Sequence, residues 1–373
     1  MKILIAPDKF KHSMSAQDVC KIIETTLKKE STNLKIESLP MADGGEGTSE
    51  ILALQANAKP VTAKVYDPLM RNIEAQYFIK GNTAFIEMAS ASGLQLLKSD
   101  EQNVLKTTSF GTGELIKDAL NKGCDKIILC IGGSATNDGG VGMASALGFQ
   151  FLNNEGEQFL PTAENLHQIK SIKLPEDNLL KGSKVSVLTD VNNPLTGKNG
   201  ASYQYAIQKG ALKKDLEFLD QGMMHLKDLI FQQFNFNIDQ YPGAGASGGM
   251  GGGATFFLNA DLYSGIEFIA DALNLDNKVK NADLVISGEG KLDTQSFQGK
   301  VVSGVLNSCH KNHKPLFLVV GYNSFKNEFP KEIKGVYSLT DLAKSQEEAI
   351  KAPEKWLVEA TQILYEDSIS LLF

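Results

Sequence analysis

The stretch KILIAPDKFKHSMSAQD, residues 2–18, joins an apolar run to a helix start through a polar loop. Lys2 to Ala6 is predicted to be a fully buried strand because it is a short, nearly continuous apolar run. Ser15 to Asp18 has the form of a capping box, in which a serine hydroxyl caps the first turn of a helix. The order strand, loop, helix is typical of parallel α/β units.

The same junction, an apolar run followed by a loop of glycines and carboxylates, recurs along the chain. It is found at residues 39–47, 127–140, 187–190 and 284–293. In an open α/β sheet the carboxyl ends of parallel strands form the edge where ligands bind. Unpaired buried charge is costly, so such loops are poorly suited to a core. They predict a site for a metal ion and a phosphate.

The pattern along the chain predicts two α/β domains. Residues 61–85 alternate between apolar and polar residues, which indicates antiparallel strands, and the strand-and-helix rhythm returns from residue 282. We therefore expect a discontinuous parallel-sheet domain made of residues 1–64 and 284–373. Residues 65–283 are expected to form an inserted mixed α/β domain. The active site is expected in the cleft between these domains.

Composition excludes several classes of protein. The 373 residues are 42% hydrophobic and 22% charged, as in ordinary globular proteins, and exceed the usual size of one core. The net charge of -7 argues against nucleic-acid binding, and no apolar run approaches the ~18 residues of a membrane span. The four cysteines show no CxxC pair. We expect a cytoplasmic protein without a membrane partner, and a homodimer is left open.

Two glycine-rich loops carry candidate ligands. In the first, Asp43 and Glu46 are predicted to bind Mg²⁺, because this ion prefers hard oxygen ligands, although both could instead favour the dipole of the following helix. Gly44 and Gly45 let the backbone approach a ligand closely. The second loop offers backbone donors for phosphate and polar side chains for a cation or hydroxyl. Its predicted ligand-binding residues are Gly132, Gly133, Ser134, Thr136 and Asn137, and its predicted metal ligand is Asp138.

Lysines accompany the loops near both chain ends. Lys9, Lys11 and His12 come just before a predicted helix N-terminus, where backbone amides already favour an anion. Lys291 and Lys300 could neutralise the oxygens of a transferring phosphoryl group. The alternatives are a solvated surface loop at the first position and an ion-paired loop at the second.

The stretch from Gly243 to Gly249 formally matches two motifs. It contains GxGxxG, and it contains GxSxG around Ser247, but the apolar strand that both motifs require does not precede it. This context argues against a dehydrogenase and against a serine hydrolase. A loop that covers a ligand or a domain hinge is the preferred interpretation, and Gly245, Ser247 and Gly248 are the predicted contacts.

In these motifs the chain resembles the type-I glycerate kinases, a family found widely in bacteria. The resemblance runs in order over essentially the whole chain. It is carried by residues 5–8 and 10–11, 41–48, 107–108 and 111–114, 131–140, 190 and 193–195, 208–210, 242–249, 288–293 and 299–301.

The resemblance implies ATP-dependent phosphorylation of D-glycerate, usually at the 2-hydroxyl, with Mg²⁺ as the metal. It also implies a flavodoxin-like, or Rossmann-like, α/β domain and a second mixed domain. The chain departs from the family at Lys9 and His12, which change the polarity beside the predicted anion site. Lys291 replaces an arginine, and residues 205–207 replace a Phe-Gly-Pro stretch.

Several roles remain alternatives at this point. Asp43, Asp190 or Asp293 would hold Mg²⁺, and Asp190 or Asp293 could instead accept the proton of the substrate hydroxyl. Lys11 or Lys209, or the helix after Ser13, would hold the substrate carboxylate. A hydrolase that uses Ser247 and a sensor without catalysis are the alternative functions, and the number of acidic strand ends argues against both. The predicted catalytic residues are Asp190, Asp293, Lys291 and Lys11, and further predicted substrate or nucleotide ligands are Asp8, Lys209, Glu289 and Lys300.

Overall fold

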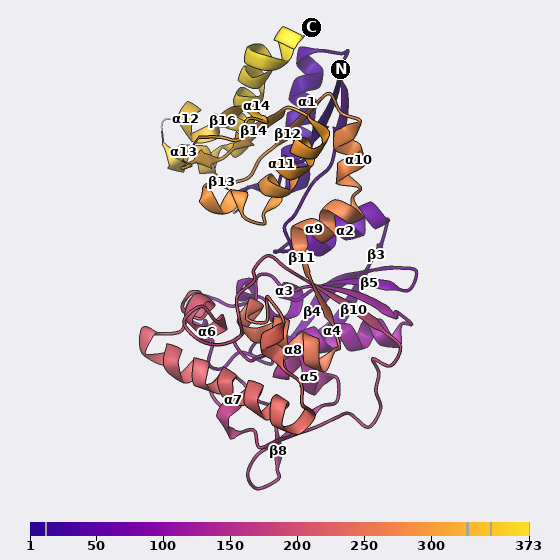
Figure 1. Ribbon diagram of the computed structural model, residues 1–373, viewed down its shortest axis with the longest axis vertical. Coiled ribbons are helices and arrows are strands. Elements are labelled where there is room, and N and C mark those ends of the chain that lie inside the picture. Colours follow the sequence, from indigo (N-terminus) through magenta and orange to yellow (C-terminus); the bar gives the residue numbers. More distant parts are fainter. Residues whose placement is uncertain (12, 326–327, 344, 373) are drawn as a thin grey trace. The chain divides into compact units, whose positions relative to one another are not determined.

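The computed structural model describes residues 1–11, 13–325, 328–343 and 345–372. The chain divides into two compact units, of which unit 1 contains Met1–Asp43 and Gly265–Phe373, and unit 2 contains Gly44–Ser264. Unit 1 is thus assembled from the two ends of the chain, coloured indigo and orange to yellow in Figure 1. Among the described residues, no helix is long and apolar enough to cross a membrane.

Unit 1 is built on a parallel sheet with the strand order β16-β14-β12-β1-β2. Numbered in chain order within the unit, this order is 2-1-3-4-5 from the β2 edge, which is the flavodoxin-like arrangement. The predicted fold class is confirmed. The strands are β1 (Lys2–Ile5), β2 (Lys35–Ser38), β12 (Leu284–Ser287), β14 (Leu316–Val320) and β16 (Ile333–Ser338), and β13 (Lys291–Leu292) pairs separately with β15 (Tyr322–Asn323).

Helices cover this sheet because its strands are apolar on both faces. Ile3 and Ile5 pack in one core with residues of α1 (Ala16–Glu30) and α14 (Pro353–Leu364). Leu4 is also fully buried and points to the opposite face, since successive strand residues alternate. As predicted, the Ser15 hydroxyl caps α1 by accepting a hydrogen bond from the N–H of Asp18. The other helices are α9 (Gly265–Ala272), α10 (Leu275–Lys280), α11 (Val301–Asn312), α12 (Leu339–Leu342) and α13 (Gln346–Lys351).

Unit 2 contains a mixed sheet with the strand order β11-β10-β6-β5-β4-β3. The strands from β3 to β5 are antiparallel, as predicted, and β5, β6, β10 and β11 are parallel. The strands of this sheet are β3 (Lys59–Tyr66), β4 (Asn72–Lys80), β5 (Thr83–Glu87), β6 (Lys126–Cys130), β10 (Lys184–Thr189) and β11 (Asp261–Ser264), while β7 (Gln150–Leu152), β8 (Gln158–Phe159) and β9 (Ser171–Lys173) form a second, antiparallel sheet.

One large apolar core joins the mixed sheet to the helices of unit 2. It includes Ile127 and Val185 from the sheet and Leu115, Met223 and Met250 from three helices. These side chains are 2% exposed or less, so the loops at the strand ends are attached to a rigid base. The helices of the unit are α2 (Thr48–Ala56), α3 (Ala89–Ser92), α4 (Phe110–Asn121), α5 (Val141–Ala146), α6 (Ala201–Tyr205), α7 (Leu216–Phe234) and α8 (Ala246–Phe257).

The two units divide at other positions than those expected from the sequence. We expected boundaries after residue 64 and before residue 284, whereas the units meet after Asp43 and before Gly265. Helix α2 belongs to unit 2 because it packs on β4 and β5. Helices α9 and α10 belong to unit 1 because they pack on α11. Helix packing, which a local pattern does not reveal, therefore decides both boundaries.

Candidate active site

Asp8 and Glu289 lie where the strand order of the unit 1 sheet reverses. Asp8 follows β1 and Glu289 follows β12, and these two strands are parallel neighbours. The N–H of Asp8 donates to the carbonyl oxygen of Gly288 at 2.8 Å, which ties the two loops together. In doubly wound sheets, ligands bind outside the carboxyl ends of the strands at this reversal. Topology thus places two predicted ligand residues at the expected location.

The carboxyl group of Asp8 lies in a strongly negative environment. Burial raises the pKa of Asp8 to about 8, and the negative charges of Asp43 and Glu289 contribute to the rise. The backbone N–H of Lys9 opposes it by donating to Asp8 Oδ1 at 2.7 Å. A carboxyl group whose pKa is raised by neighbouring negative charges would be stabilised in its ionised form by a bound cation.

Glu289 is more deeply buried, with 6% of its surface exposed. Burial raises the pKa of Glu289 to about 7, opposed by a hydrogen bond from Ser296 and by the positive charge of Lys300. Within the part of the chain that the structure describes, the Oε1 atom of Glu289 has no hydrogen-bond partner. Buried polar atoms in proteins are nearly always partnered, so this oxygen is available to a ligand.

Lys291 and Asp293, both predicted to be catalytic, form an ion pair with each other. The distance from Lys291 Nζ to Asp293 Oδ2 is 3.0 Å. Asp293 also caps a short 3-10 helix, because its Oδ1 accepts from the N–H of Gln295 at 2.9 Å. Burial would raise the pKa of Asp293, but these donors outweigh it and the pKa is lowered. This environment makes Asp293 a weaker proton acceptor than Glu289.

The loop that carries Lys11 packs tightly against the loop that carries Glu289. A Cβ placed on Gly290 would lie 3.0 Å from the backbone nitrogen of Lys11, so a side chain there would crowd the loop. Lys11 itself is exposed at the same edge of the sheet. Ser15 caps the following helix, α1, by accepting from the N–H of Asp18. This N–H at the helix start is therefore already bonded within the chain. His12 lies outside the described residues.

In unit 2, the loop between β6 and α5 is held from within by Asp138. The Oδ2 atom of this fully buried carboxylate accepts from the N–H and hydroxyl of Ser109, both at 2.8 Å, and from the N–H of Gly142 at 3.3 Å. Its Oδ1 atom accepts from the N–H of Gly140 at 3.1 Å. Burial raises the pKa of Asp138, and these donors oppose the rise. The geometry favours a structural role for Asp138 over the metal-binding role predicted from the sequence.

The same loop receives the side chain of Lys209. Lys209 is 3% exposed, and its Nζ donates to Ser134 Oγ at 2.7 Å and to the carbonyl oxygen of Thr136 at 2.8 Å. The structure therefore brings together three residues that were predicted as ligands from distant parts of the sequence. Burial lowers the pKa of Lys209 to about 7, opposed by the charge of Asp138.

The glycines of the two predicted ligand loops touch each other in unit 2. A Cβ placed on Gly132 would lie 2.7 Å from Gly45 Cα, so the backbones meet where neither has a side chain. Glu46 is exposed beside this contact. Sequence reasoning missed Glu87, whose carboxylate accepts from the N–H of Gly47 at 2.6 Å and from the hydroxyl of Ser49 at 2.8 Å. Glu87 thus holds the start of α2, and its position just after residues 61–85, which were predicted to form strands, was the signal for it.

Ser247 lies at a kink in α8 and not at a nucleophile elbow. Ser247, Gly248 and Gly249 all have left-handed backbone angles, which is unusual for the serine. The Ser247 hydroxyl donates to the carbonyl oxygen of Ile131, whereas a nucleophilic serine donates to a general base. Close approach explains the glycines that surround it, since a Cβ on Gly245 would lie 2.0 Å from the carbonyl oxygen of Pro194.

Asp190 is exposed directly after β10 in unit 2. Its negative charge acts on Tyr205, whose pKa is raised to about 12 by burial and by Asp190. The Tyr205 hydroxyl donates to Asn193 Oδ1 at 2.5 Å, which joins α6 to the loop after Asp190. Tyr205 belongs to the stretch 205–207, in which the sequence departs from the resembled family. This stretch therefore contacts the loop that carries the predicted catalytic residue Asp190.

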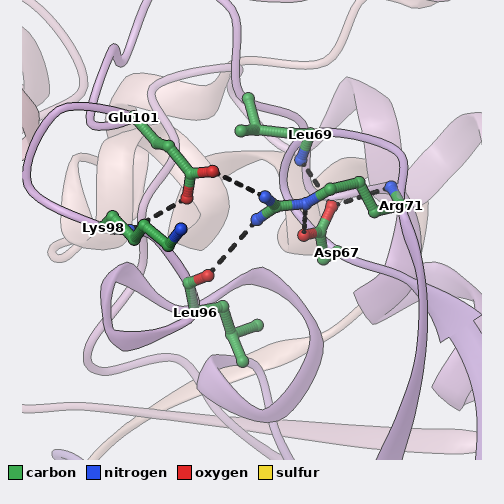
Figure 2. Close-up of polar contacts among 6 residues, drawn as sticks. All are labelled: Asp67, Leu69, Arg71, Leu96, Lys98 and Glu101. Atoms are coloured by element: carbon green, nitrogen blue, oxygen red, sulfur yellow. Dashed lines mark hydrogen bonds and ion pairs between the residues drawn. The ribbon is translucent and has the colours of Figure 1, made fainter.

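Figure 2 shows a further polar cluster, centred on Arg71, that sequence reasoning missed. Arg71 Nε donates to Asp67 Oδ2 at 2.6 Å, and Nη1 donates to Glu101 Oε1 at 2.7 Å. Asp67 is 2% exposed and also accepts from the N–H of Leu69 at 2.9 Å. Arg71 is the only arginine in the sequence, and this rarity could have marked it as a residue with a specific role. The planar guanidinium connects the loop of Asp67 with the loop of Glu101, because its N–H donors point to both carboxylates.

A metal ion would need ligands from outside the protein as well. Among the described residues, no group of three or more histidine, cysteine, aspartate or glutamate side chains is placed to hold one.

Comparisons with known proteins place the chain in a family. The model of the glycerate kinase family matches residues 3–367. The chain is 40% identical over 360 residues to the glycerate kinase of Bacillus cereus, covering 95% of this chain and 94% of that one. It is 43% identical over 324 residues to the glycerate 2-kinase of Escherichia coli, covering 86% and 85%.

A solved structure extends the comparison to the fold. The crystal structure of a protein assigned as glycerate kinase 2 from Salmonella typhimurium LT2 superposes with a TM-score of 0.84. The two chains are 37% identical, and the match covers 100% of each. The architecture of both units is therefore shared with that protein.

Proposed function

Since this chain belongs to the glycerate kinase family, and so is a phosphotransferase, we propose that it transfers the γ-phosphoryl group of ATP to the 2-hydroxyl of D-glycerate. The product would be 2-phosphoglycerate. The relative from Escherichia coli is named a glycerate 2-kinase, which supports this position of transfer. The observation that carries the proposal is the group of carboxylates at the reversal of the unit 1 sheet, where Asp8 has a pKa near 8.

Mg²⁺ fits this group of carboxylates. Asp8 and Asp43 supply hard oxygen ligands, and their mutual repulsion would be relieved by a cation. When bound, Mg²⁺ would neutralise charge on the phosphate oxygens of ATP. We propose that Asp8 and Asp43 hold the ion. The sequence had suggested Asp43, Glu46 and Asp138, with Asp190 and Asp293 as alternatives.

Glu289 is the proposed proton acceptor. Its Oε1 atom is buried and has no partner among the described residues, so it can accept the proton of the substrate hydroxyl. A general base works best when its pKa is near the operating pH, and the pKa of Glu289 is about 7. Asp190 and Asp293 remain predictions for this role, and Asp293 is the weaker base because its pKa is lowered.

Lysines would neutralise the transferring group. Lys300 already acts on both Glu289 and Asp293 through its charge, which places it at the same strand end. Lys291 is exposed and needs only to leave Asp293 to reach a phosphate. Phosphoryl transfer depends mainly on positioning and charge neutralisation, so these lysines would act without covalent chemistry.

The test is a direct assay of the product. Purified protein is incubated with ATP, Mg²⁺ and D-glycerate, and phosphorus NMR follows the phosphoglycerate that forms. A 2-phosphoglycerate signal is the expected result. A 3-phosphoglycerate signal would correct the position of transfer, and the absence of any product from folded protein would overturn the proposal for D-glycerate.

A further inference from the structure

Lys209 is a buried lysine that forms no ion pair with the residues that the structure describes. It is 3% exposed, and both of its hydrogen bonds go to neutral oxygens, those of Ser134 and Thr136. The buried carboxylate of Asp138 acts on Lys209 through its charge, but the hydrogen bonds that Asp138 accepts among the described residues come from Ser109, Gly140 and Gly142. An ammonium group has three N–H donors, so one donor remains. Burying an unpaired charge is costly, which indicates that an anion compensates it during function.

Two unpartnered oxygens lie in the stretch that holds Lys209. Thr136 Oγ1 and Asn137 Oδ1 are fully buried, and neither has a hydrogen-bond partner within the described part of the chain. The amide nitrogen of Asn137 donates to Ser202 Oγ at 3.1 Å, so only its oxygen is left. Native structures contain few such atoms, and each one requires an explanation. Here two occur in adjacent residues beside a buried lysine.

The unpartnered groups define the chemistry of the missing ligand. The lysine needs an anionic oxygen, and Asn137 Oδ1 needs a donor such as a hydroxyl. A phosphate group offers only acceptors near neutral pH and would leave Asn137 Oδ1 opposed to another oxygen. A small hydroxy acid offers both a carboxylate and hydroxyl donors. The cluster therefore favours the substrate over the nucleotide.

We infer that Lys209, Thr136 and Asn137 form a subsite that binds the carboxylate and hydroxyl groups of a small hydroxy acid. The inference rests on the proposed function and specifies which residues would recognise D-glycerate. From the sequence, the substrate carboxylate was expected to bind Lys11, Lys209 or the helix after Ser13. The subsite assigns it to Lys209, with Asn137 as the hydroxyl acceptor.

Close backbone packing keeps this subsite rigid. A Cβ on Gly210 would lie 1.9 Å from the carbonyl oxygen of Gln102, so the residue after Lys209 is fixed against that segment. A Cβ on Gly248 would lie 2.0 Å from the carbonyl oxygen of Thr136. Binding groups that are positioned before the ligand arrives lose less entropy on binding.

The experiment measures binding of D-glycerate without nucleotide, by isothermal titration calorimetry on the full chain. Lys209→Met keeps most of the length of the unbranched side chain and removes its charge. We expect affinity for D-glycerate to fall about 10- to 100-fold, because a charged hydrogen bond is lost, while affinity for ATP is unchanged. Lys214→Met, at an exposed lysine, is the matched control and should bind both ligands normally.

A second readout separates binding from a merely structural role. Burial lowers the pKa of Lys209 to about 7, so part of the population is neutral at pH 7.5. A bound carboxylate raises that pKa, and binding should take up a fraction of a proton. The uptake is measured from the binding enthalpy in buffers of different ionisation enthalpy. It should be present in the wild type and in Lys214→Met, and absent in Lys209→Met.

Asn137→Ala provides an independent variant if Lys209→Met does not fold. It should weaken D-glycerate and leave ATP unchanged. Folded Lys209→Met or Asn137→Ala that binds D-glycerate within twofold of the wild type overturns the subsite, even if the wild type makes phosphoglycerate. A wild type that neither binds nor phosphorylates D-glycerate overturns the proposed function instead. Titration with glycolate, D-lactate and L-glycerate then decides on the subsite, which fails if none of them binds.

Discussion

Glu289 in unit 1 and Asp138 in unit 2 are buried carboxylates in loops that follow a strand, yet they differ in their partners. Burial raises the pKa of both. Asp138 accepts four hydrogen bonds from nearby backbone and serine groups, whereas the Oε1 atom of Glu289 has no partner among the residues that the structure describes. Burial and a raised pKa are thus shared by a carboxylate that holds a loop and by one that is available for chemistry. The hydrogen-bond partners distinguish them.

The largest effect is expected at Glu289. Glu289→Gln keeps the shape of the side chain and removes its ability to take a proton, so kcat should fall about 10²- to 10⁴-fold. The melting temperature should not fall, because the buried charge is removed. Steady-state kinetics and thermal unfolding measure the two quantities.

Glu354→Gln is the matched control, since Glu354 is an exposed glutamate of the same unit. It should change neither kcat nor the melting temperature. Turnover of Glu289→Gln within a few fold of the wild type would show that Glu289 is not the proton acceptor, and Asp190 would then become the leading candidate.

Asp138→Ala should show the opposite pattern. Removing the carboxylate leaves buried N–H and hydroxyl donors unpaired, so the free energy of unfolding should fall by roughly 2–4 kcal/mol. Chemical denaturation measures this change. A variant with normal stability and lost Mg²⁺ dependence would instead restore Asp138 as the metal ligand predicted from the sequence.

The negative environment of Asp8 should be visible as pH-dependent stability. The pKa of Asp8 is about 8 in the folded protein against 3.8 for the ordinary group, so its contribution to stability is present at low pH. That contribution is lost progressively as the pH rises from about 4 to about 8. Asp8→Asn stays neutral, and its melting temperature should exceed that of the wild type by a few degrees at pH 9 and by much less at pH 5.

Mg²⁺ sharpens this test. Excess Mg²⁺ should raise the melting temperature of the wild type at pH 9 if Asp8 and Asp43 hold the ion. It should have less effect on Asp8→Asn, which has lost one ligand. Equal stabilisation of both proteins by Mg²⁺ would remove Asp8 from the proposed metal site.

The smallest effect is expected at Arg71. Lysine serves as the cation at every other basic position, but Arg71→Lys cannot reproduce two separate donors in one plane. The denaturant midpoint should fall slightly, and by less than in Asp138→Ala, because the Arg71 side chain is 46% exposed. A double-mutant cycle with Glu101→Gln tests this contact. Glu101→Gln should lower the denaturant midpoint of the wild type but have little effect in the Arg71→Lys background. An unchanged midpoint in Arg71→Lys would show that charge alone is sufficient.

Local patterns in the sequence were enough to predict the strands near both chain ends and the antiparallel start of unit 2. Those predictions hold because a strand or a helix cap depends on residues within a few positions, as at Ser15 and Asp18. The domain boundaries were different from the structure because α2 and α9 are assigned by what they pack against. The resemblance to a known family supplied the flavodoxin-like strand order.

The sequence by itself determined which chemical groups are available after the strands. It places carboxylates and lysines there, among them Asp8, Asp43, Asp138 and Glu289. Only the tertiary structure decided their roles. It paired Lys291 with Asp293, gave both oxygens of Asp138 hydrogen-bond donors, and left one oxygen of Glu289 without a partner in the described part of the chain. It also buried Lys209 beside residues more than 70 positions away. Hydrogen bonding and desolvation depend on groups brought together by folding, and their partners cannot be inferred from neighbours in the chain.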